Sequence, residues 1–303
     1  MILEPPDLVA LRLAETRHYL FDHPDLRNAG FTIQTYREQL DRLAAAGILR
    51  SFHLTLVVPP LAGGNWVWAA ILGRAETPYE TAHQLTSRLP FITEILFNAC
   101  FPANIGPNLA LLFFSRDLEN ETRFIQNLAG LRELEVFKIR EYAYPVSLPL
   151  SGEEKAFIRF LMQNPDADAE TVSAHFGQNE NWVRAKLDRL LWTEENRSGI
   201  FRIQPAIDWS KAENFGHFHF LLETGHRPEE IARLTAENGF QLVMSGRPIS
   251  GRYLTLEADV WGIPDLIARI DLLERLNGVR VAGITYNQEV LINDRWVART
   301  IGT

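Results

Sequence analysis

The sequence predicts an α+β fold in which one module is built twice. Between residues 54 and 144 the pattern of apolar and polar residues runs strand, helix, strand, strand, helix, strand, and the same order returns between residues 215 and 291. A helical segment precedes each copy, and both segments end in the tetrapeptide LDRL, at 40–43 and 187–190. A fused pair of this kind can make, within one chain, the interface that a single-copy relative makes by dimerising.

The first copy is punctuated by proline and glycine. Pro78 is typical of a first helical turn, Ala82 and Leu85 follow at helical spacing, and Gly106 belongs to a loop between two apolar runs. The expected elements are a strand at 65–72, a helix at 78–90, strands at 92–101 and 107–114, a helix at 118–131 and a strand at 134–144.

The second copy repeats this order with a nearly constant offset. Pro107 aligns with Gly251, and Val136 aligns with Val281. The expected elements are a strand at 217–223, a helix at 228–239, strands at 240–246 and 252–260, a helix at 264–276 and a strand at 279–292. The constant offset indicates a tandem duplication.

The segment before the second copy predicts three helices and a strand. Ser151 and Glu154 form the pattern of a capping box, the run DAETVSAHFG gives a short second helix that ends at Gly177, and NENWVRAKLDRLLW gives a third. The run FRIQPAI then has the shape of a wing strand. Three helices and a wing indicate a winged helix-turn-helix, whose last helix enters the major groove of DNA.

The corresponding segment before the first copy is less complete. Residues 8–21 predict a helix and 32–50 a second helix with a turn at Gly47, but the run DHPDLRNAG at 22–30 predicts no helix between them. We therefore expect a structural role for this segment rather than contact with DNA.

This order resembles the Lrp/AsnC group of prokaryotic transcription regulators. The resemblance is carried by EKAFIRFLMQNPDADAETVSAHFGQNENWVRAKLDRL and by the runs around PNLALLFF and GRYLTLEADV. It implies a degenerate winged-helix segment (1–58), a ferredoxin-like βαββαβ effector unit (59–148), a winged helix-turn-helix (149–212) and a second effector unit (213–303), which together form an internal pseudo-dimer. It also implies DNA and a small, amino-acid-like effector as partners, and a homodimer or higher oligomer of the pseudo-dimers.

Local positive charge marks the expected DNA contacts. We expect residues at the start of the third helix to contact base edges and residues of the wing to contact phosphates, because side chains at those places reach the groove and the DNA backbone. The candidates are Asn179, Asn181, Arg184, Lys186, Arg189, Arg197 and Arg202. The alternative is an ordinary solvated helix face.

The resemblance implies an effector site where the two βαββαβ units meet, lined by their hairpin loops. The candidates are Asn104, Gly106, Asn108, Arg247, Gly251, Arg252 and Tyr253. Arg247 or Arg252 could hold a carboxylate, and the alternative for Gly106 and Gly251 is that they only allow the hairpins to turn.

An enzyme is the rival hypothesis. The siroheme decarboxylases resemble Lrp/AsnC regulators in this doubled architecture, so fold alone does not separate the two. A decarboxylase needs a proton donor and cations for several carboxylates, and the candidates are His217, His219, His226 and Arg247. A third alternative is a regulator that acts through protein contacts without binding DNA.

Composition narrows the field. The 303 residues are 46% hydrophobic and carry a net charge of −8, which argues against general attraction to nucleic acid and leaves any DNA contact to local Lys and Arg. No stretch is long and apolar enough for a membrane helix, and one cysteine, Cys100, excludes an internal disulfide, so we expect a cytoplasmic protein and an inert, buried thiol. His217 and His219 lack an evident third ligand at fixed spacing, and no phosphate or dinucleotide motif occurs, so no metal or cofactor is predicted.

Overall fold

The computed structural model describes residues 1–16, 24–101, 106–144, 147–193, 196–243, 253–295 and 297–301. Its elements group into two compact units, each assembled from separate stretches of the chain. The sheet unit consists of Met1–Ile2, Trp66–Tyr142 and Asp208–Leu291, and the helix unit consists of Leu3–Asn65, Ala143–Ile207 and Ile292–Thr303. Each unit therefore contains parts of both sequence copies.

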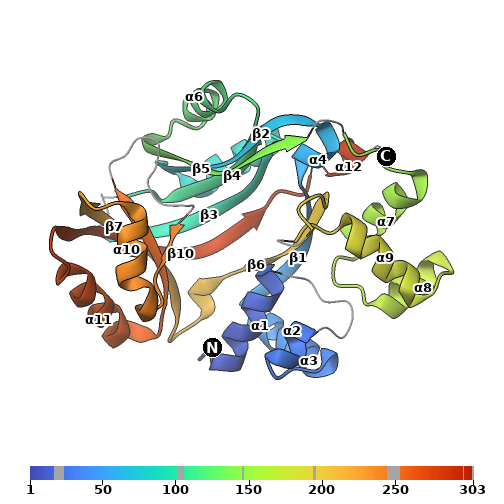
Figure 1. Cartoon of the computed structure of the whole chain (residues 1–303), viewed down its shortest axis with the longest axis horizontal. Coiled ribbons are helices and arrows are strands. Elements are labelled where there is room, and N and C mark those ends of the chain that lie inside the picture. Colours follow the sequence, from blue (N-terminus) through green and yellow to red (C-terminus); the bar gives the residue numbers. More distant parts are fainter. Residues whose placement is uncertain are drawn as a thin grey trace. The chain divides into compact units, whose positions relative to one another are not determined.

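The sheet unit contains both predicted βαββαβ modules (Figure 1). The first copy consists of β2 (Gly64–Arg74), α5 (Pro78–Arg88), β3 (Ile92–Phe101), β4 (Leu109–Ser115), α6 (Leu118–Ala129) and β5 (Arg132–Tyr144). The second copy consists of β7 (Gly216–Thr224), α10 (Pro228–Thr235), β8 (Gln241–Leu242), β9 (Leu254–Val260), α11 (Gly262–Glu274) and β10 (Val279–Ile292). The fold class and the duplication predicted from the sequence are thus confirmed.

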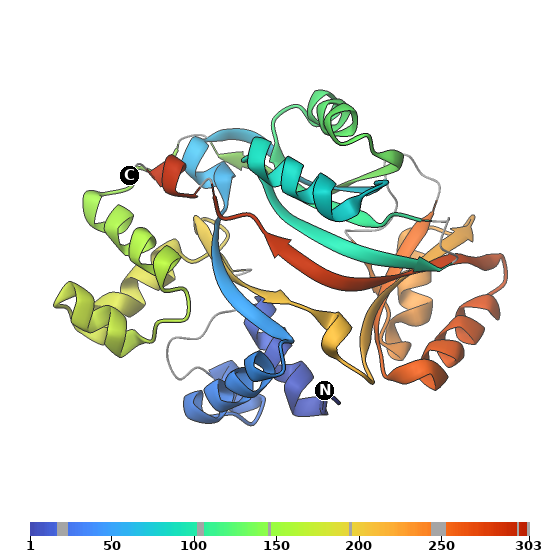
Figure 2. The same ribbon diagram turned by 180° about the vertical axis from the view of Figure 1, so that it is seen from behind.

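All these strands form one sheet in the order β5-β2-β4-β3-β10-β7-β9-β8. Within each copy the fourth strand lies beside the first and the second beside the third, as in a ferredoxin-like unit. The two copies meet where β3 lies beside β10, and both views of the ribbon show these two strands side by side (Figures 1 and 2). Within the described part of the chain, this junction pairs the second strand of the first copy with the fourth strand of the second copy.

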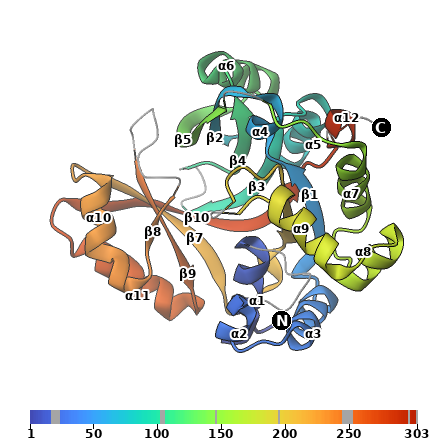
Figure 3. The ribbon, with the colours of Figure 1, turned by 45° about the vertical axis from the view of Figure 1, so that its right-hand side comes forward.

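Helices cover one face of each half of the sheet. Pro78 begins α5, and its buried residues Ala82 and Leu85 pack with the apolar side chains of β3 and β4 in one core cluster; Figure 2 shows α5 lying along β3. In the second copy, Ile231 of α10 and Leu273 of α11 pack on strand residues in a separate cluster, and Figure 3 shows both helices on the same side of the strands.

The opposite face differs between the two copies. In the first copy the buried residues Ala70, Leu112 and Phe137 form an apolar cluster on this face, beside the buried polar side chains of Asn98 and Glu135. In the second copy the same face carries polar side chains, among them His217 and His219 of β7.

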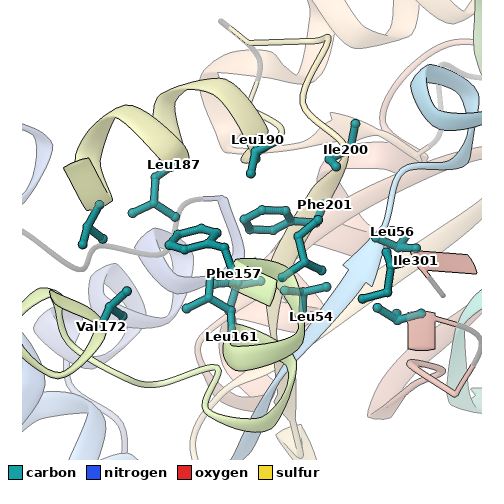
Figure 4. Packing of buried hydrophobic residues seen from close by; sticks show 14 residues of the cluster. Leu54, Leu56, Phe157, Leu161, Val172, Leu187, Leu190, Ile200, Phe201 and Ile301 are labelled. Carbon is teal, nitrogen blue, oxygen red and sulfur yellow. The ribbon is translucent and has the colours of Figure 1, made fainter. Parts of the chain in front are cut away.

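The helix unit contains the complete three-helix segment, with α7 (Gly152–Gln163), α8 (Ala169–Phe176) and α9 (Glu180–Leu190). Ser151 and Glu154 form the predicted capping box, and Asp168 and Asn179 cap the next two helices. The inner faces of the three helices share one core, which includes Phe157, Val172 and Leu187 (Figure 4).

The segment before the first copy is more complete than the sequence predicted. It consists of α1 (Pro5–Thr16), α2 (Pro24–Asn28) and α3 (Ile33–Ala45), so the expectation that 22–30 contains no helix was wrong. Proline at the first position of α2 needs no N–H partner, and the fully buried Leu26 fixes this single turn in the core. One buried leucine in five residues gives no periodic signal, which is why the pattern failed to reveal the helix.

The predicted wing strand does not form a separate wing, because it pairs with a strand of the first helical segment. The strand β1 (Leu49–Leu56) runs antiparallel to β6 (Phe201–Ile207), with Leu49 opposite Ile207 and Leu56 opposite Phe201. As a result, the far end of β1 supplies Leu54 and Leu56 to the core of α7, α8 and α9 (Figure 4). Conversely, β6 contacts α1. Each strand therefore links the two helical segments of this unit.

The remaining elements are short. They are α4 (Val58–Ala62), the 3₁₀ turns η1 (Trp209–Lys211) and η2 (Ala236–Asn238), and α12 (Val297–Ile301). The strand predicted at 240–246 is described only as the two residues of β8, because 244–252 lie outside the described residues. Among the described residues, none of the helices combines the length and the apolar character that a membrane crossing requires.

Candidate functional site

The third helix of the complete helical segment, α9, presents the predicted base-contacting residues. Val183, Leu187 and Leu190 are buried, as the helical spacing predicted. Asn181 and Arg184 lie on the exposed side of the helix, one turn apart. The outer surface of α9 therefore begins with an amide and a guanidinium group.

Other predicted contacts on this helix have structural partners. The Asn179 Oδ1 accepts a hydrogen bond from the Trp182 backbone N–H at 3.0 Å, so this side chain caps the helix. Lys186 Nζ lies 2.5 Å from Glu153 Oε2, and Arg189 Nε lies 2.8 Å from Glu154 Oε1. The two cations therefore tie α9 to the start of α7.

The two arginines assigned to the wing lie in different surroundings. Arg197 is exposed in the turn before β6, and its carbonyl oxygen accepts a hydrogen bond from the Tyr144 hydroxyl at 2.7 Å. Arg202 lies within β6, and its guanidinium carbon is 3.8 Å from the ring centroid of Trp192. Stacking of this kind holds the Arg202 guanidinium against the tryptophan ring.

The third helix of the first segment, α3, carries two arginines, and both are engaged. Arg37 Nη1 lies 3.3 Å from Asp168 Oδ2, and Arg42 forms an ion pair with the fully buried Asp7. The exposed carboxylates of Glu38 and Asp41 remain on the same helix. This charge distribution is unsuited to a phosphate backbone.

The predicted effector loops are described in part. Asn104, Arg247, Gly251 and Arg252 lie outside the described residues. Asn108 makes two hydrogen bonds of 2.8 Å with the backbone of Ala75, one as acceptor and one as donor, and therefore fixes the loop.

Gly106 and Tyr253, the other described residues of the predicted effector site, are also packed against the protein. The φ of Gly106 is +93°, a backbone conformation that favours glycine, and a Cβ there would lie 3.0 Å from Leu221 Cδ1, which the leucine side chain would have to move to relieve. Tyr253 is buried, with 5% of its surface exposed.

A cluster of titratable side chains occupies the polar face of the second copy. His217 and His219 alternate with Phe218 and Phe220 on β7, so the histidines share the face opposite the helices. Across the sheet on β9, Asp259 lies directly opposite His217 and Glu257 directly opposite His219. The antiparallel register thus brings two imidazoles and two carboxylates together.

The geometry of this cluster is compact. His217 Nδ1 lies 2.9 Å from Asp259 Oδ1, which is a hydrogen bond. Glu257 Oε2 lies 3.6 Å from His217 Nε2 and 3.7 Å from His219 Nε2. The side chain of His219 is 5% exposed and that of His217 is 14% exposed.

Burial controls the protonation of His219. Loss of solvent lowers the pKa of His219 to about 4, and the neighbouring His217 acts in the same direction. His219 is therefore a neutral imidazole near pH 7, with a ring nitrogen available as a lone-pair donor.

His226, the third histidine of the enzyme hypothesis, is not part of this cluster. It follows the other end of β7, and at about 3.3 Å per residue the run from His219 to Thr224 alone spans roughly 17 Å. Its hydrogen bond to the Asn277 carbonyl oxygen, followed by one to Glu230, raises the pKa of His226 above the ordinary value. The structure thus separates the predicted catalytic set into two places, with Arg247 outside the described residues.

Sequence reasoning missed Glu257 and Asp259. They stand about forty positions after the histidines, so no local spacing connects the two pairs. No metal was predicted because the sequence shows no evident third ligand near the histidines. The available signal was two runs, H-x-H and E-x-D, on strands expected to be neighbours, since alternate residues of neighbouring strands share a face.

The single cysteine behaves as predicted. Cys100 is buried at the end of β3, its thiol lies 2.8 Å from the Pro107 carbonyl oxygen, and burial raises the pKa of this thiol to about 11. A thiol with this pKa is protonated near neutral pH and is a poor nucleophile.

Comparisons with known proteins found structural likenesses only. No protein-family model matches the chain, and no curated protein sequence matches it. The siroheme decarboxylase NirDL is similar over 98% of both chains, with 13% sequence identity and a TM-score of 0.47. A transcriptional regulator from Neisseria meningitidis, in complex with L-Met, matches 49% of this chain and 97% of its own, at 18% identity and a TM-score of 0.26. MtbAldR matches 49% of this chain and 99% of its own, at 14% identity and a TM-score of 0.28.

Proposed function

We propose that this protein is a DNA-binding transcription regulator whose reading helix is α9. The observation that carries the proposal is the exposed start of this helix, where Asn181 and Arg184 stand one turn apart on a capped, three-helix segment. In a helix-turn-helix, residues at the start of the last helix meet base edges in the major groove. Asparagine pairs with adenine and arginine with guanine by two hydrogen bonds each, so the two side chains match that role.

The phosphate contacts belong to the turn before β6. Arg197 is exposed there, and Arg202 of β6 stacks on Trp192. Lys186 and Arg189 are held by Glu153 and Glu154, and they contribute less because DNA must compete with an existing ion pair. The net charge of −8 makes the interaction local and dependent on salt.

A small, amino-acid-like effector would act through the sheet unit. The support is that the loop of the first copy reaches the second copy, since Gly106 lies against Leu221 of β7 and Thr285 of β10. A ligand at this junction would change how the two copies meet and could alter the spacing of the reading helices in a dimer.

The test is binding to the DNA upstream of the gene across a salt series. The unchanged protein is compared with an Asn181→Ala, Arg184→Ala double variant and with Arg123→Ala, a matched control that removes an exposed arginine from α6 in the sheet unit. We expect the double variant to lose roughly 1–3 kcal/mol at the cognate sequence for each two-bond contact removed. The control should bind as the unchanged protein does.

A further variant, Arg197→Ala, separates positioning from reading. It should weaken binding equally at all sequences and make the salt dependence shallower by about 0.9 in log–log slope for one lost phosphate contact. Absence of binding at low salt, with or without amino acids, would contradict the proposal and favour a regulator that acts through protein contacts.

A siroheme-decarboxylase-like enzyme is the second candidate. The observation that favours it is the pair His217 and His219, in which the buried imidazole of His219 is neutral and lies against the ring of His217. The adjacent carboxylates of Glu257 and Asp259 repel a substrate that carries several carboxylates. Titration of the protein with siroheme, followed by absorbance, tests the enzyme hypothesis. A saturable spectral change that His219→Gln removes would support the enzyme, whereas an unchanged spectrum would exclude it.

A further inference from the structure

We propose that the polar face of the second copy binds a divalent transition-metal ion, with His217, His219 and Glu257 as its ligands. The potential ligand atoms of these three residues all lie within 4.8 Å of one another. They come from directly paired positions of two neighbouring strands, β7 and β9, so the sheet backbone fixes their separation. The proposal concerns the sheet unit and does not depend on DNA binding by α9.

The distances fit an ion between the ligands better than a direct hydrogen bond. Glu257 Oε2 lies 3.6 Å from one histidine Nε2 and 3.7 Å from the other. A charge-assisted hydrogen bond is shorter, at about 2.7–2.9 Å. Ligand atoms at about 2.0–2.2 Å from a tetrahedral zinc ion are separated by about 3.4 Å. The two distances to Glu257 are close to this separation, and the ligand atoms of the two histidines, which lie within 4.8 Å, would have to approach each other.

A second carboxylate orients one of the ligands. Asp259 Oδ1 lies 2.9 Å from His217 Nδ1, which leaves His217 Nε2 on the side of Glu257. Histidines that bind metals commonly donate their other ring N–H to a carboxylate in this way, which fixes both the ring and its tautomer. Asp259 thus occupies the place of an outer carboxylate.

The chemistry of the ligand set also suits a transition metal. Two imidazoles and one carboxylate favour Zn²⁺, Co²⁺ or Ni²⁺ over the oxygen-seeking Mg²⁺ and Ca²⁺. Three protein ligands leave a fourth position for water or a small ligand.

Two polar atoms without a hydrogen-bond partner among the described residues lie on the same sheet face as the cluster. On β10, Thr285 is directly opposite His219, and Asn287 follows on the same face. Asn287 is 4% exposed and Thr255, on the face of Glu257, is 0% exposed. Within the described part of the chain, the Asn287 Oδ1 and the Thr255 Oγ1 have no hydrogen-bond partner. Buried atoms of this kind normally have one, so they point to a water or ligand held at this face.

The test is direct metal binding by the full-length protein freed of metal with a chelator. Zn²⁺ binding is measured by isothermal titration calorimetry, and Co²⁺ binding by its visible absorption. We expect one ion per chain and the intense visible bands of four-coordinate Co²⁺. His217→Ala and Glu257→Gln should abolish both signals, while Asp259→Asn should weaken affinity about 10- to 100-fold.

The matched control is His226→Ala, which removes a more exposed histidine at the far end of β7. Its affinity should equal that of the unchanged protein, and circular dichroism establishes that every variant is folded. Lack of Zn²⁺ binding by the unchanged protein would overturn the proposal. Binding that persists in the folded His217→Ala and Glu257→Gln variants would overturn it as well, whatever the outcome of the DNA experiment.

Discussion

Asp168 shows how one side chain can serve two parts of the helix unit. Its Oδ1 accepts a hydrogen bond from the Thr171 backbone N–H at 2.7 Å, which caps α8, and its Oδ2 lies 3.3 Å from Arg37 of α3. The hydrogen bonds with Thr171, and after them the charge of Arg37, lower the pKa of the Asp168 carboxyl. The residue thus joins the start of a helix in one segment to an arginine in the other.

The effect of Asp168 on stability should depend on pH. An unfolded aspartate has a pKa of about 3.9. Because the folded pKa is lower, the ionised carboxylate stabilises the fold fully above about pH 4, and this contribution is lost as the pH falls through the folded pKa. We expect Asp168→Ala to reduce the free energy of unfolding by about 1 kcal/mol at pH 7.

Urea denaturation at pH 7 and near pH 3 checks this prediction. The difference between Asp168→Ala and the unchanged protein should shrink at the lower pH. Asp166→Ala, which removes an exposed carboxylate two residues earlier, serves as the control and should have little effect at either pH. An equal loss for Asp168→Ala at both pH values would contradict the assigned role of its charge.

At the scale of elements, the turn between α9 and β6 sets the direction in which β6 leaves the helix. Ile200 donates its backbone N–H to the Leu190 carbonyl oxygen at 2.7 Å, and Trp192 donates its own to Phe201 at 2.7 Å. The chain passes itself so closely that a Cβ on Gly199 would lie 2.4 Å from the carbonyl carbon of Leu191. This close turn leads into β6, which pairs with β1 instead of forming a separate wing.

Gly199→Ala should therefore destabilise the helix unit. Because the clash is with backbone atoms, neighbouring side chains cannot relieve it, and we expect a loss of about 1–3 kcal/mol or more. Gly152→Ala is the matched control, since a Cβ there meets nothing within 4 Å at the first position of α7. Thermal unfolding should show a lower midpoint for Gly199→Ala alone, and equal midpoints for the two variants would refute this account of the turn.

The element scale also explains where prediction from sequence succeeded. The bounds predicted for β3, β6 and β10 agree with those of the structure, because runs of apolar or alternating residues bounded by turn residues carry a period-2 signal. The helix α2 gave no such signal. The pairing of β1 with β6 also could not be predicted, because either strand has the same pattern whether it pairs locally or with the other copy.

At the scale of the whole molecule, the proposed function gives each chain one reading helix, α9, since the arginines of α3 are engaged by Asp168 and Asp7. A palindromic operator requires two such helices. The sheet ends at β5, whose charged residues include Arg132, Lys138 and Glu141, and charged edges oppose unlimited addition of further strands. A closed dimer is therefore the expected assembly.

Light scattering coupled to size-exclusion chromatography tests this assembly. We expect a mass of twice the 34.6 kDa of the chain. The mass should be the same at low and high salt if apolar contacts hold the dimer, because screening affects only charged contacts. A strict monomer would make recognition of a palindromic site by this protein untenable.

The sequence by itself determined the local elements other than α2, the duplication and the burial of residues such as Cys100 and Val183. These properties depend on periodicity and on punctuation by glycine and proline, which act over a few residues. Only the tertiary structure decided that β3 joins β10, that β1 joins β6, and that Glu257 and Asp259 face the two histidines. The physical reason is that strand partners and register are selected by packing between segments distant in the chain, and one residue of slip would have turned both carboxylates to the other face.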